Sequence, residues 1–390
     1  MEKKISRDKS YKFCKPLCGA PGNRACVPLE EGAGSREDSM IKTAIIGAAL
    51  AIAPIAATAQ ATLTAETTTP GSTPHYIDTT LAGILDSAGV ATLQITEGAT
   101  LTNSVQAVAE GQLDMAPAPL ILPFLLSRGI GPYSGIGAED GARLAENLRV
   151  IFWNSGSAQI FAYYNNNPVE DIRALDGLRI WNGPPRGAAL TSGRAMVQLL
   201  SGLKDGEGYE GIQTPWPDAV STMTGGGADA WTSPEGLPSG RQIAIAAAGG
   251  ITMHDIPSDL LASTLGQQIV AAPGHAPYSL PVEDFRNAYA GNDITVVTDD
   301  DTFDTYATAF GQIVNASMDE DLAYRITKAY LDGERRFIEG SPRGPFSRLS
   351  FGDIDGVSQG ACGTVQVKMH AGAIRAFEEA GHTVADCLRP

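Results

Sequence analysis

A strand, a Gly/Pro loop and a helix follow one another between Leu178 and Leu203, and this order limits the possible folds most. The short apolar run 178–181 reads as a strand, and apolar residues recur at helical spacing after the loop Gly-Pro-Pro-Arg-Gly, residues 183–187. A helix N-terminus presents unpaired N–H groups and partial positive charge, and the Arg186 guanidinium matches a carboxylate, so the stretch suits an anion. The alternative is an ordinary strand-to-helix turn with a surface arginine.

Residues 40–61 have the pattern of a secretory signal peptide. They read Met-Ile-Lys-Thr, then an apolar Ala-rich run, then an Ala-Gln-Ala cleavage site. The run is too short for a membrane anchor, and the remaining alternative is a buried apolar helix. We therefore expect an exported protein of the periplasm.

The segment upstream of this pattern, residues 1–39, is polar and broken by Gly and Pro. Because a signal peptide normally begins a chain, we expect translation to start at Met40 and residues 1–39 to be a disordered, misassigned extension. Cys14, Cys18 and Cys26 lie in it, but neither a His nor a fourth Cys completes a metal site there.

The chain is acidic, with a formal net charge of −16 at pH 7, and its basic residues are concentrated before residue 43. A field of this sign repels nucleic acid and anionic membranes, so we expect neither as a partner. An anionic ligand would need local positive groups. Of the cysteines, Cys362 and Cys387 remain in the exported part, and an oxidising compartment favours a disulfide between them.

The exported part repeats one pattern twice. Gly111-x-x-Asp114 and Gly226-x-x-Asp229 each follow a helix and precede a short strand, and a Gly/Pro loop feeds a helix near Gly71 and again near Gly183. The pattern predicts an α/β fold of two lobes, joined by a hinge, whose strand ends and helix N-termini face a shared cleft. We place lobe 1 at residues 62–158 and 293–390, and lobe 2 at 159–292.

Local patterning also predicts individual elements. We expect strands at 91–96, 113–116, 150–153, 160–164, 229–231, 243–248, 267–270 and 294–297. We expect helices at 103–110, 169–175, 190–203 and 218–224, after a capping box at 317–320, and at 369–380. The acidic run 299–301 is interpreted as a solvated turn that caps the next helix.

Motifs for catalysis are weak. None of the five His pairs at metal spacing, and neither a phosphate-binding loop nor a dinucleotide fingerprint occurs. The pattern Gly-x-Ser-x-Gly at 356–360 lacks the flanking strand and helix of a hydrolase nucleophile, although a secreted hydrolase that uses Ser358 stays an alternative. We therefore predict a binding protein, not an enzyme, with no metal and no cofactor.

Four segments in order resemble the TAXI-type solute receptors of TRAP transporters, over nearly the whole exported part. The loop at 70–76 is similar to their Gly-Gly-Thr-Tyr-Tyr segment, and Glu110–Asp114 resembles their helix-to-strand signature. Residues 169–187 are similar to their block that ends in Gly-Pro-Pro-Gly-Ser-Gly, and 368–377 to their closing helix.

The resemblance implies a bilobed, monomeric periplasmic receptor that closes on a small carboxylate, such as glutamate or 2-oxoglutarate. It implies delivery of this solute to TRAP membrane subunits driven by an ion gradient. A bilobed sensor that presents its bound form to a signalling receptor is the alternative. Carried over by position, the ligand-binding residues are Gly71, Ser72, Thr73, Tyr76, Gly183, Pro185, Arg186, Gly187 and Ala188.

The chain departs from the family pattern in both loops. Ala118-Pro119-Leu120 stands where the family has Gln-Ser-Asp, and Arg186-Gly187-Ala188 where it has Ser-Gly-Thr. Lost acceptors and a gained cation favour an organic mono- or diacid over glutamate. Trp216 and Trp231 are candidates for the apolar wall of the pocket, with core packing as the alternative role of both.

Overall fold

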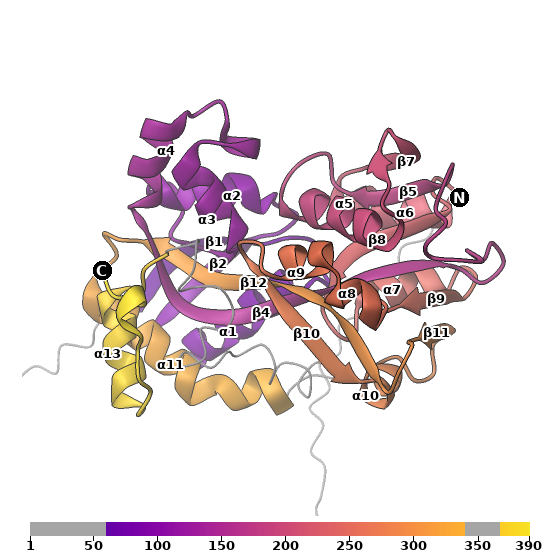
Figure 1. The fold of residues 1–390 in the computed structure, drawn as a ribbon. Coiled ribbons are helices and arrows are strands. Elements are labelled where there is room, and N and C mark those ends of the chain that lie inside the picture. Colours follow the sequence, from indigo (N-terminus) through magenta and orange to yellow (C-terminus); the bar gives the residue numbers. More distant parts are fainter. Residues whose placement is uncertain (1–59, 340–366) are drawn as a thin grey trace, which may run out of the picture. The chain divides into compact units, whose positions relative to one another are not determined.

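Two long strands, β4 (Leu148–Tyr164) and β12 (Thr302–Asn315), lie antiparallel and side by side through the middle of the fold (Figure 1). The computed structural model describes residues 60–339 and 367–390. Residues 1–39, nearly all of the predicted signal peptide, Ser358 and Cys362 lie outside these ranges.

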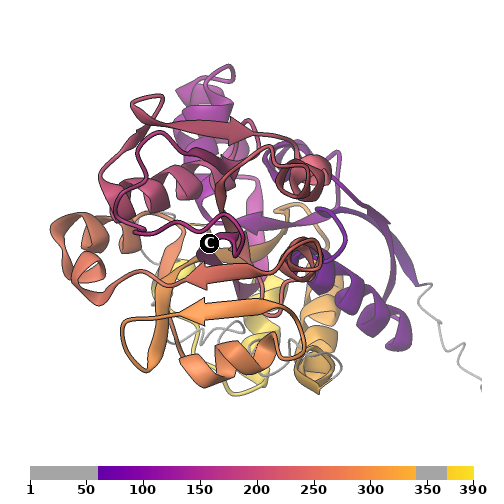
Figure 2. The ribbon, with the colours of Figure 1, turned by 90° about the vertical axis from the view of Figure 1, so that its right-hand side faces the viewer.

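The remaining strands extend the sheet on both sides of this central pair. In order across the sheet they are β2 (Ala91–Thr96), β1 (Ala61–Glu66), β3 (Met115–Pro119), β12, β4, β8 (Ala230–Glu235), β5 (Arg179–Gly183), β7 (Gly208–Gln213) and β6 (Lys204–Asp205). Outside this path, β9 (Ile251–His254) pairs with β4 and with β11 (Ile294–Val297), and β10 (His275–Pro281) pairs with β12. Figure 2 shows β9 and β11 as neighbouring arrows that point the same way.

Helices connect most of the strands, which is typical of an α/β fold. The first group is α1 (Thr73–Ser87), α2 (Leu101–Ala109), α3 (Ile121–Arg128), η1 (Gly131–Tyr133) and α4 (Ala138–Ala145). The second group is α5 (Ala188–Ser201), η2 (Trp216–Asp218), α6 (Ala219–Thr224), α7 (Gly240–Ala246), α8 (Ser258–Ala262), α9 (Thr264–Val270) and α10 (Val282–Ala288). The chain continues with α11 (Glu320–Glu339), α13 (Ala371–Glu379) and η3 (Asp386–Leu388), and α13 lies beside α11 (Figure 1).

The two long strands pass through different parts of the apolar core along their length. Residues up to Trp153 on β4 pack with the core around β1 to β3, α11 and α13, whereas Ile160 and later residues pack around β5, β8 and β9. The same change occurs on β12 between Tyr306 and Ala309. The predicted α/β fold is confirmed, and the division into two lobes that move about a hinge stays a prediction.

Two predicted strands are helices. The segments 243–248 and 267–270 fall in α7 and α9, although their isoleucines and valine favour strands. Each helix begins at a serine whose hydroxyl accepts a hydrogen bond from the backbone N–H three residues later, Ser239 from Gln242 and Ser263 from Gly266. These caps start the helices and override the propensity of the apolar residues.

Three other local predictions differ from the structure in whole or in part. Residues 169–175 form no helix, because the Asp171 carboxylate accepts a hydrogen bond from the Arg173 backbone and holds a turn. Residues 150–153 and 160–164 are strand as predicted, but the single strand β4 contains both without a break. The acidic run 299–301 precedes β12 and not a helix, and Asp299 accepts two hydrogen bonds from Ser258 at the start of α8.

The cap of α11 differs from the predicted one. The helix at 320 is capped by Asp319, which accepts from the Leu322 backbone, while the Ser317 hydroxyl binds Asn315. The Asp218 side chain makes no capping bond to α6. Within residues 60–339 and 367–390, no helix combines the length and the hydropathy that a membrane span needs.

Candidate functional site

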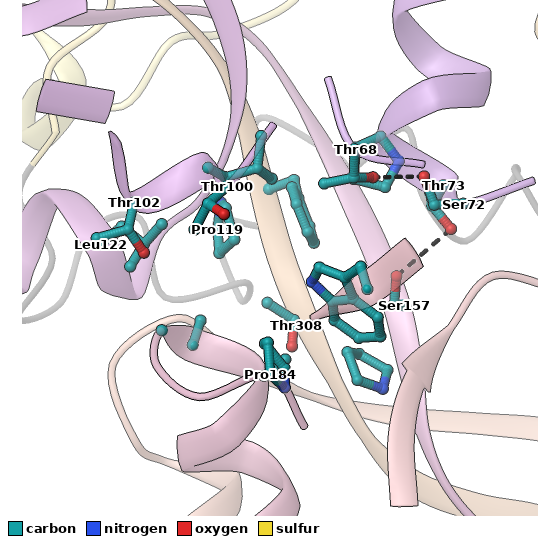
Figure 3. Close-up of a pocket in the computed structure, with 18 of the residues that line it drawn as sticks. Thr68, Ser72, Thr73, Thr100, Thr102, Pro119, Leu122, Ser157, Pro184 and Thr308 are labelled. Carbon is teal, nitrogen blue, oxygen red and sulfur yellow. Dashed lines mark hydrogen bonds between the residues drawn. The ribbon is translucent and has the colours of Figure 1, made fainter. Parts of the chain in front are cut away.

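A pocket lies beside the paired strands β4 and β12, at Ser157 and Thr308, where the strands pass from one part of the apolar core to the next. It holds about 720 Å³ of empty space, part of it open to solvent. Helix α1, helix α2, the loop before α5, η2 and the segment from β8 to α7 all reach it (Figure 3). The polar and charged residues that line it are Thr68, Ser72, Thr73, Thr100, Thr102, Ser157, Arg186, Glu235, Arg241 and Thr308.

The loop before α5 presents a cation and a helix N-terminus to the pocket. Gly183 ends β5 with φ +134°, and a Cβ there would lie 2.9 Å from the backbone of Leu190, so the strand turns into the helix without room for a side chain. Gly187 is the N-cap of α5 and makes no side-chain bond to the helix amides. The exposed Arg186 beside it has no carboxylate partner among the described residues.

Helix α1 reaches the same pocket, and its own cap satisfies part of its N-terminus. The hydroxyl of Ser72 accepts a hydrogen bond from the His75 backbone and binds the hydroxyl of Thr68. Ser157 of β4 donates to Thr73 at 3.4 Å, so a hydrogen bond joins the helix to the long strand (Figure 3). Pro74 has no N–H to offer.

Helix α2 supplies a third N-terminus. Its cap residue Thr100 makes no side-chain bond to the helix, and the next two residues line the pocket. Thr102 is 5% exposed and meets the neighbouring helix α5 closely, because a Cβ on Gly187 would lie 3.2 Å from Thr102 Oγ1. The N-termini of α2 and α5 therefore lie next to each other.

A buried ion pair forms the wall next to α7. Arg241 Nη1 lies 2.7 Å from Glu235 Oε1, and the two side chains are 10% and 3% exposed. The guanidinium also lies over the Trp216 ring, 4.3 Å from its centroid, in a cation–π contact. Trp216 in turn packs against Trp181. This pair is rigidly held and carries no net charge.

Six of the residues predicted as ligand-binding line the pocket together, namely Ser72, Thr73, Arg186, Gly187, Ala188 and Trp216. Gly71, Tyr76, Gly183 and Pro185 lie in or next to the same loops but do not line it. Trp231 does not reach the pocket either, because it is fully buried in the core and donates from Nε1 to Gln242 Oε1 at 3.1 Å. Its role in the structure is packing, which was the alternative.

The pocket also contains residues that we did not single out from the sequence. Arg241 and Glu235 were missed because the segment around 243 was assigned to a strand, although Ser239-x-x-Gln242 has the form of a capping box. Thr100 and Thr102 follow a correctly predicted strand and begin the next helix, which is the same arrangement that drew attention to Arg186. Ser157 and Thr308 lie on the long strands, whose continuity the pattern did not reveal.

A buried carboxyl group lies behind the loop that carries Thr68. Asp78 of α1 is fully buried, and burial raises the pKa of its carboxyl group to about 8. Hydrogen bonding, chiefly with Gln312, lowers this pKa by a smaller amount. Gln312 Nε2 donates to Asp78 Oδ1 at 3.1 Å, while Asp78 Oδ2 has no partner in the described part of the chain. The group therefore stays protonated at neutral pH and does not add negative charge near the pocket.

Cys387 is disulfide-bonded. Its predicted partner Cys362 lies outside the described ranges, so this pairing stays a prediction. Among residues 60–339 and 367–390, no three His, Cys, Asp or Glu side chains come together to hold a metal ion. The pocket's chemistry is therefore described by hydroxyls, one balanced ion pair, Arg186 and helix N-termini.

Comparison of the sequence with models of known protein families finds a match to one family. The sequence model of the NMT1-like family matches residues 128–381. The curated proteins contain no match to the chain.

The solved structures similar to this chain include three periplasmic or extracytoplasmic binding proteins. A TRAP periplasmic solute binding protein from Polaromonas sp. JS666, bound to D-erythronate, is 11% identical over 83% of this chain and 93% of its own, with a TM-score of 0.41. An extracytoplasmic solute receptor of Bordetella pertussis that binds pyroglutamic acid is 10% identical over 82% and 92%, with a TM-score of 0.41. For the aliphatic sulphonate binding protein of Escherichia coli the values are 14% identity, 49% of this chain, 58% of that one and a TM-score of 0.35.

Proposed function

This chain belongs to the NMT1-like family, and we propose that it is a periplasmic solute-binding protein of the TAXI type, which captures a small carboxylate. In this proposal it acts as a monomer and delivers the solute to the membrane subunits of a TRAP transporter, which an ion gradient drives. The observation that supports it most is the convergence of Arg186 and the N-termini of α1, α2 and α5 on one pocket.

The chemistry of this convergence favours an anion. First-turn N–H groups have no acceptor within their own helix, and a helix end carries partial positive charge. Arg186 adds a full charge and a forked donor that fits a carboxylate. Since the chain as a whole is strongly acidic, such a local positive region is what an anionic solute would require.

The placement of the pocket also suits capture by closure. Residues from both core regions line it, and β4 and β12 connect these regions beside it. The pairing of β12 with β4 shifts register between Thr308 and Ala309, which is a local irregularity at the pocket. We propose that bending near this point lets the two lobes close, so that the acid leaves water and contacts Arg186.

A thermal-shift screen tests the proposal. The purified chain would be heated with a library of small organic acids, each paired with its neutral amide. At least one acid should raise the melting temperature in proportion to its concentration, and its amide should not, because only the acid uses the positive groups. Stabilisation by the amides to the same extent, or by no acid in the library, would contradict the proposed function.

A further inference from the structure

Within the described part of the chain, the charged side chains that line the pocket leave one cation without a counter-charge. They are Arg186, Glu235 and Arg241. Glu235 neutralises Arg241, and its two oxygens also accept hydrogen bonds from Ser233, Ser239 and Gln242. Glu235 is therefore held in place by four donors and has little capacity left for an ammonium group.

The pocket has two ends of different character. At one end, Gly187 of the α5 N-terminus lies against Thr102 of the α2 N-terminus, next to Arg186. At the other end, the loop before α1 lies against the start of α7, since a Cβ on Gly71 would be 4.0 Å from Gly240 Cα. Figure 3 shows Thr102 on one side of the pocket and Ser72 and Thr73 on the other.

The two ends differ in their unsatisfied donors. At α2 and α5 the N-cap residues Thr100 and Gly187 make no side-chain bond to the first-turn N–H groups of their helices. At α1 the Ser72 hydroxyl already caps the helix, and Pro74 lacks an N–H. The donors that can bind an acid group are thus concentrated at the α2/α5 end.

A largely buried threonine marks this end independently. Thr102 is 5% exposed, lines the pocket, and its side chain has no hydrogen-bond partner among the described residues. The hydroxyl of this largely buried residue is free to bond at the pocket, so its position favours a bound group that completes its hydrogen bonding.

From this asymmetry we infer that the solute is a monoanion bound in one orientation. Its single carboxylate or sulfonate binds between Thr102 and Arg186 at the α2/α5 end, and its uncharged remainder lies against the Glu235–Arg241 pair and the hydroxyls of Ser72 and Thr73. The inference rests on the proposed function and narrows its solute class. Glu235 becomes the residue that determines this specificity.

The charge balance explains which solutes are rejected. A second carboxylate at the Glu235 end would be buried without a free counter-cation and beside a carboxylate, which is unfavourable. An ammonium group would lie close to Arg241 and find the oxygens of Glu235 already occupied. Diacids and amino acids should therefore bind more weakly than monoacids of the same skeleton.

Calorimetric titration of the purified chain with matched acids tests this inference. The probes are pentanoate, glutarate and glutamate, which share five carbons, together with benzoate and phthalate. In each set the monoacid should bind at least about tenfold more tightly. Tighter binding of the diacid or the amino acid would overturn the inference and leave the proposed function standing. If none of the probes gives a heat of binding, the assignment of a monoacid solute is overturned. If the thermal-shift screen also finds no stabilising acid, the proposed function is overturned as well.

The variant Glu235→Gln tests the role of Glu235. Glutamine keeps an acceptor for Arg241 but removes the negative charge, so glutarate should bind at least about tenfold more tightly than to the original chain, with a smaller change for pentanoate. The control Glu283→Gln breaks an exposed ion pair with Arg286 and should change neither affinity. If a folded Glu235→Gln variant keeps the original preference for pentanoate over glutarate, Glu235 does not determine the specificity. If this variant fails to fold, the comparison of acids on the original chain still decides whether the solute is a monoanion or a dianion.

Discussion

The backbone of Gly187 lies directly against the side chain of Thr102, so that the N-termini of two helices share one end of the pocket. A Cβ at position 187 would be 3.2 Å from Thr102 Oγ1, and the φ of +104° with an extended ψ is a conformation that glycine adopts and L residues avoid. The pocket's shape at this end therefore depends on the absence of a side chain.

Gly187→Ala should lower the free energy of unfolding by about 2 kcal/mol and weaken solute binding, because the loop must shift away from Thr102. Urea denaturation measures the first effect and calorimetry the second. Gly89→Ala is the control, since Gly89 has φ +64° but open space around its Cβ, and it should lose only about 1 kcal/mol and leave affinity unchanged. Equal effects of the two substitutions would show that the contact with Thr102 is unimportant.

Trp216 and Trp231 should respond to substitution in opposite ways. Trp231→Phe leaves Gln242 Oε1 without its donor and opens a cavity in the core, so the unfolding free energy should fall by about 2–3 kcal/mol with unchanged affinity. Trp216→Phe removes part of the surface under Arg241 and should weaken binding with a smaller loss of stability. Loss of affinity in Trp231→Phe and none in Trp216→Phe would reverse the two roles.

The buried carboxyl of Asp78 gives stability a defined pH dependence. Burial raises the pKa of Asp78 from its usual value of 3.8 to about 8 in the folded chain. Between these two pH values the folded state therefore keeps a proton that the unfolded state has released. Stability from this group is therefore full below about pH 4 and falls as pH rises toward 8. Asp78→Asn should lose this part of the slope, which urea midpoints at pH 5 and pH 8 would detect; an identical pH dependence in both proteins would mean that Asp78 titrates normally.

The predicted disulfide between Cys362 and Cys387 can be tested by peptide mapping without reductant. One cross-linked pair of peptides should contain both residues, and Cys387→Ser should cost about 3 kcal/mol of unfolding free energy, because the unfolded chain gains conformational entropy without the cross-link. A peptide that links Cys387 to another cysteine would refute the pairing, while the bond at Cys387 itself would stand.

The repeated half-pattern of the sequence was informative about the site. Both predicted loops, around Ser72 and around Arg186, contribute to the same pocket because parallel strands of an α/β sheet end on the same side and helices begin there. The glycine-rich sequence of the second loop anticipated the turn at Gly183. These signals are local and lie in single stretches of the chain.

Other parts depended on partners that the local sequence does not show. The predicted strands 113–116 and 229–231 stop short of β3 and β8, which continue to Pro119 and through Pro234, and both prolines line the pocket. The parallel neighbours reach only part of each strand, since β1 pairs with β3 only at Met115 and β5 pairs with β8 only up to Trp231. One side of each strand is thus open beyond these points, where a missing N–H costs no sheet hydrogen bond.

The comparison of Arg186→Ala with the unchanged chain tests the central claim, binding of a small acid in this pocket, most directly. Calorimetry with the most stabilising acid of the screen should show a loss of about 2 kcal/mol, roughly thirtyfold in Kd. Arg143→Ala, which removes an exposed arginine paired with Asp140, should leave Kd unchanged. Equal affinities for Arg186→Ala and the unchanged chain would contradict the account.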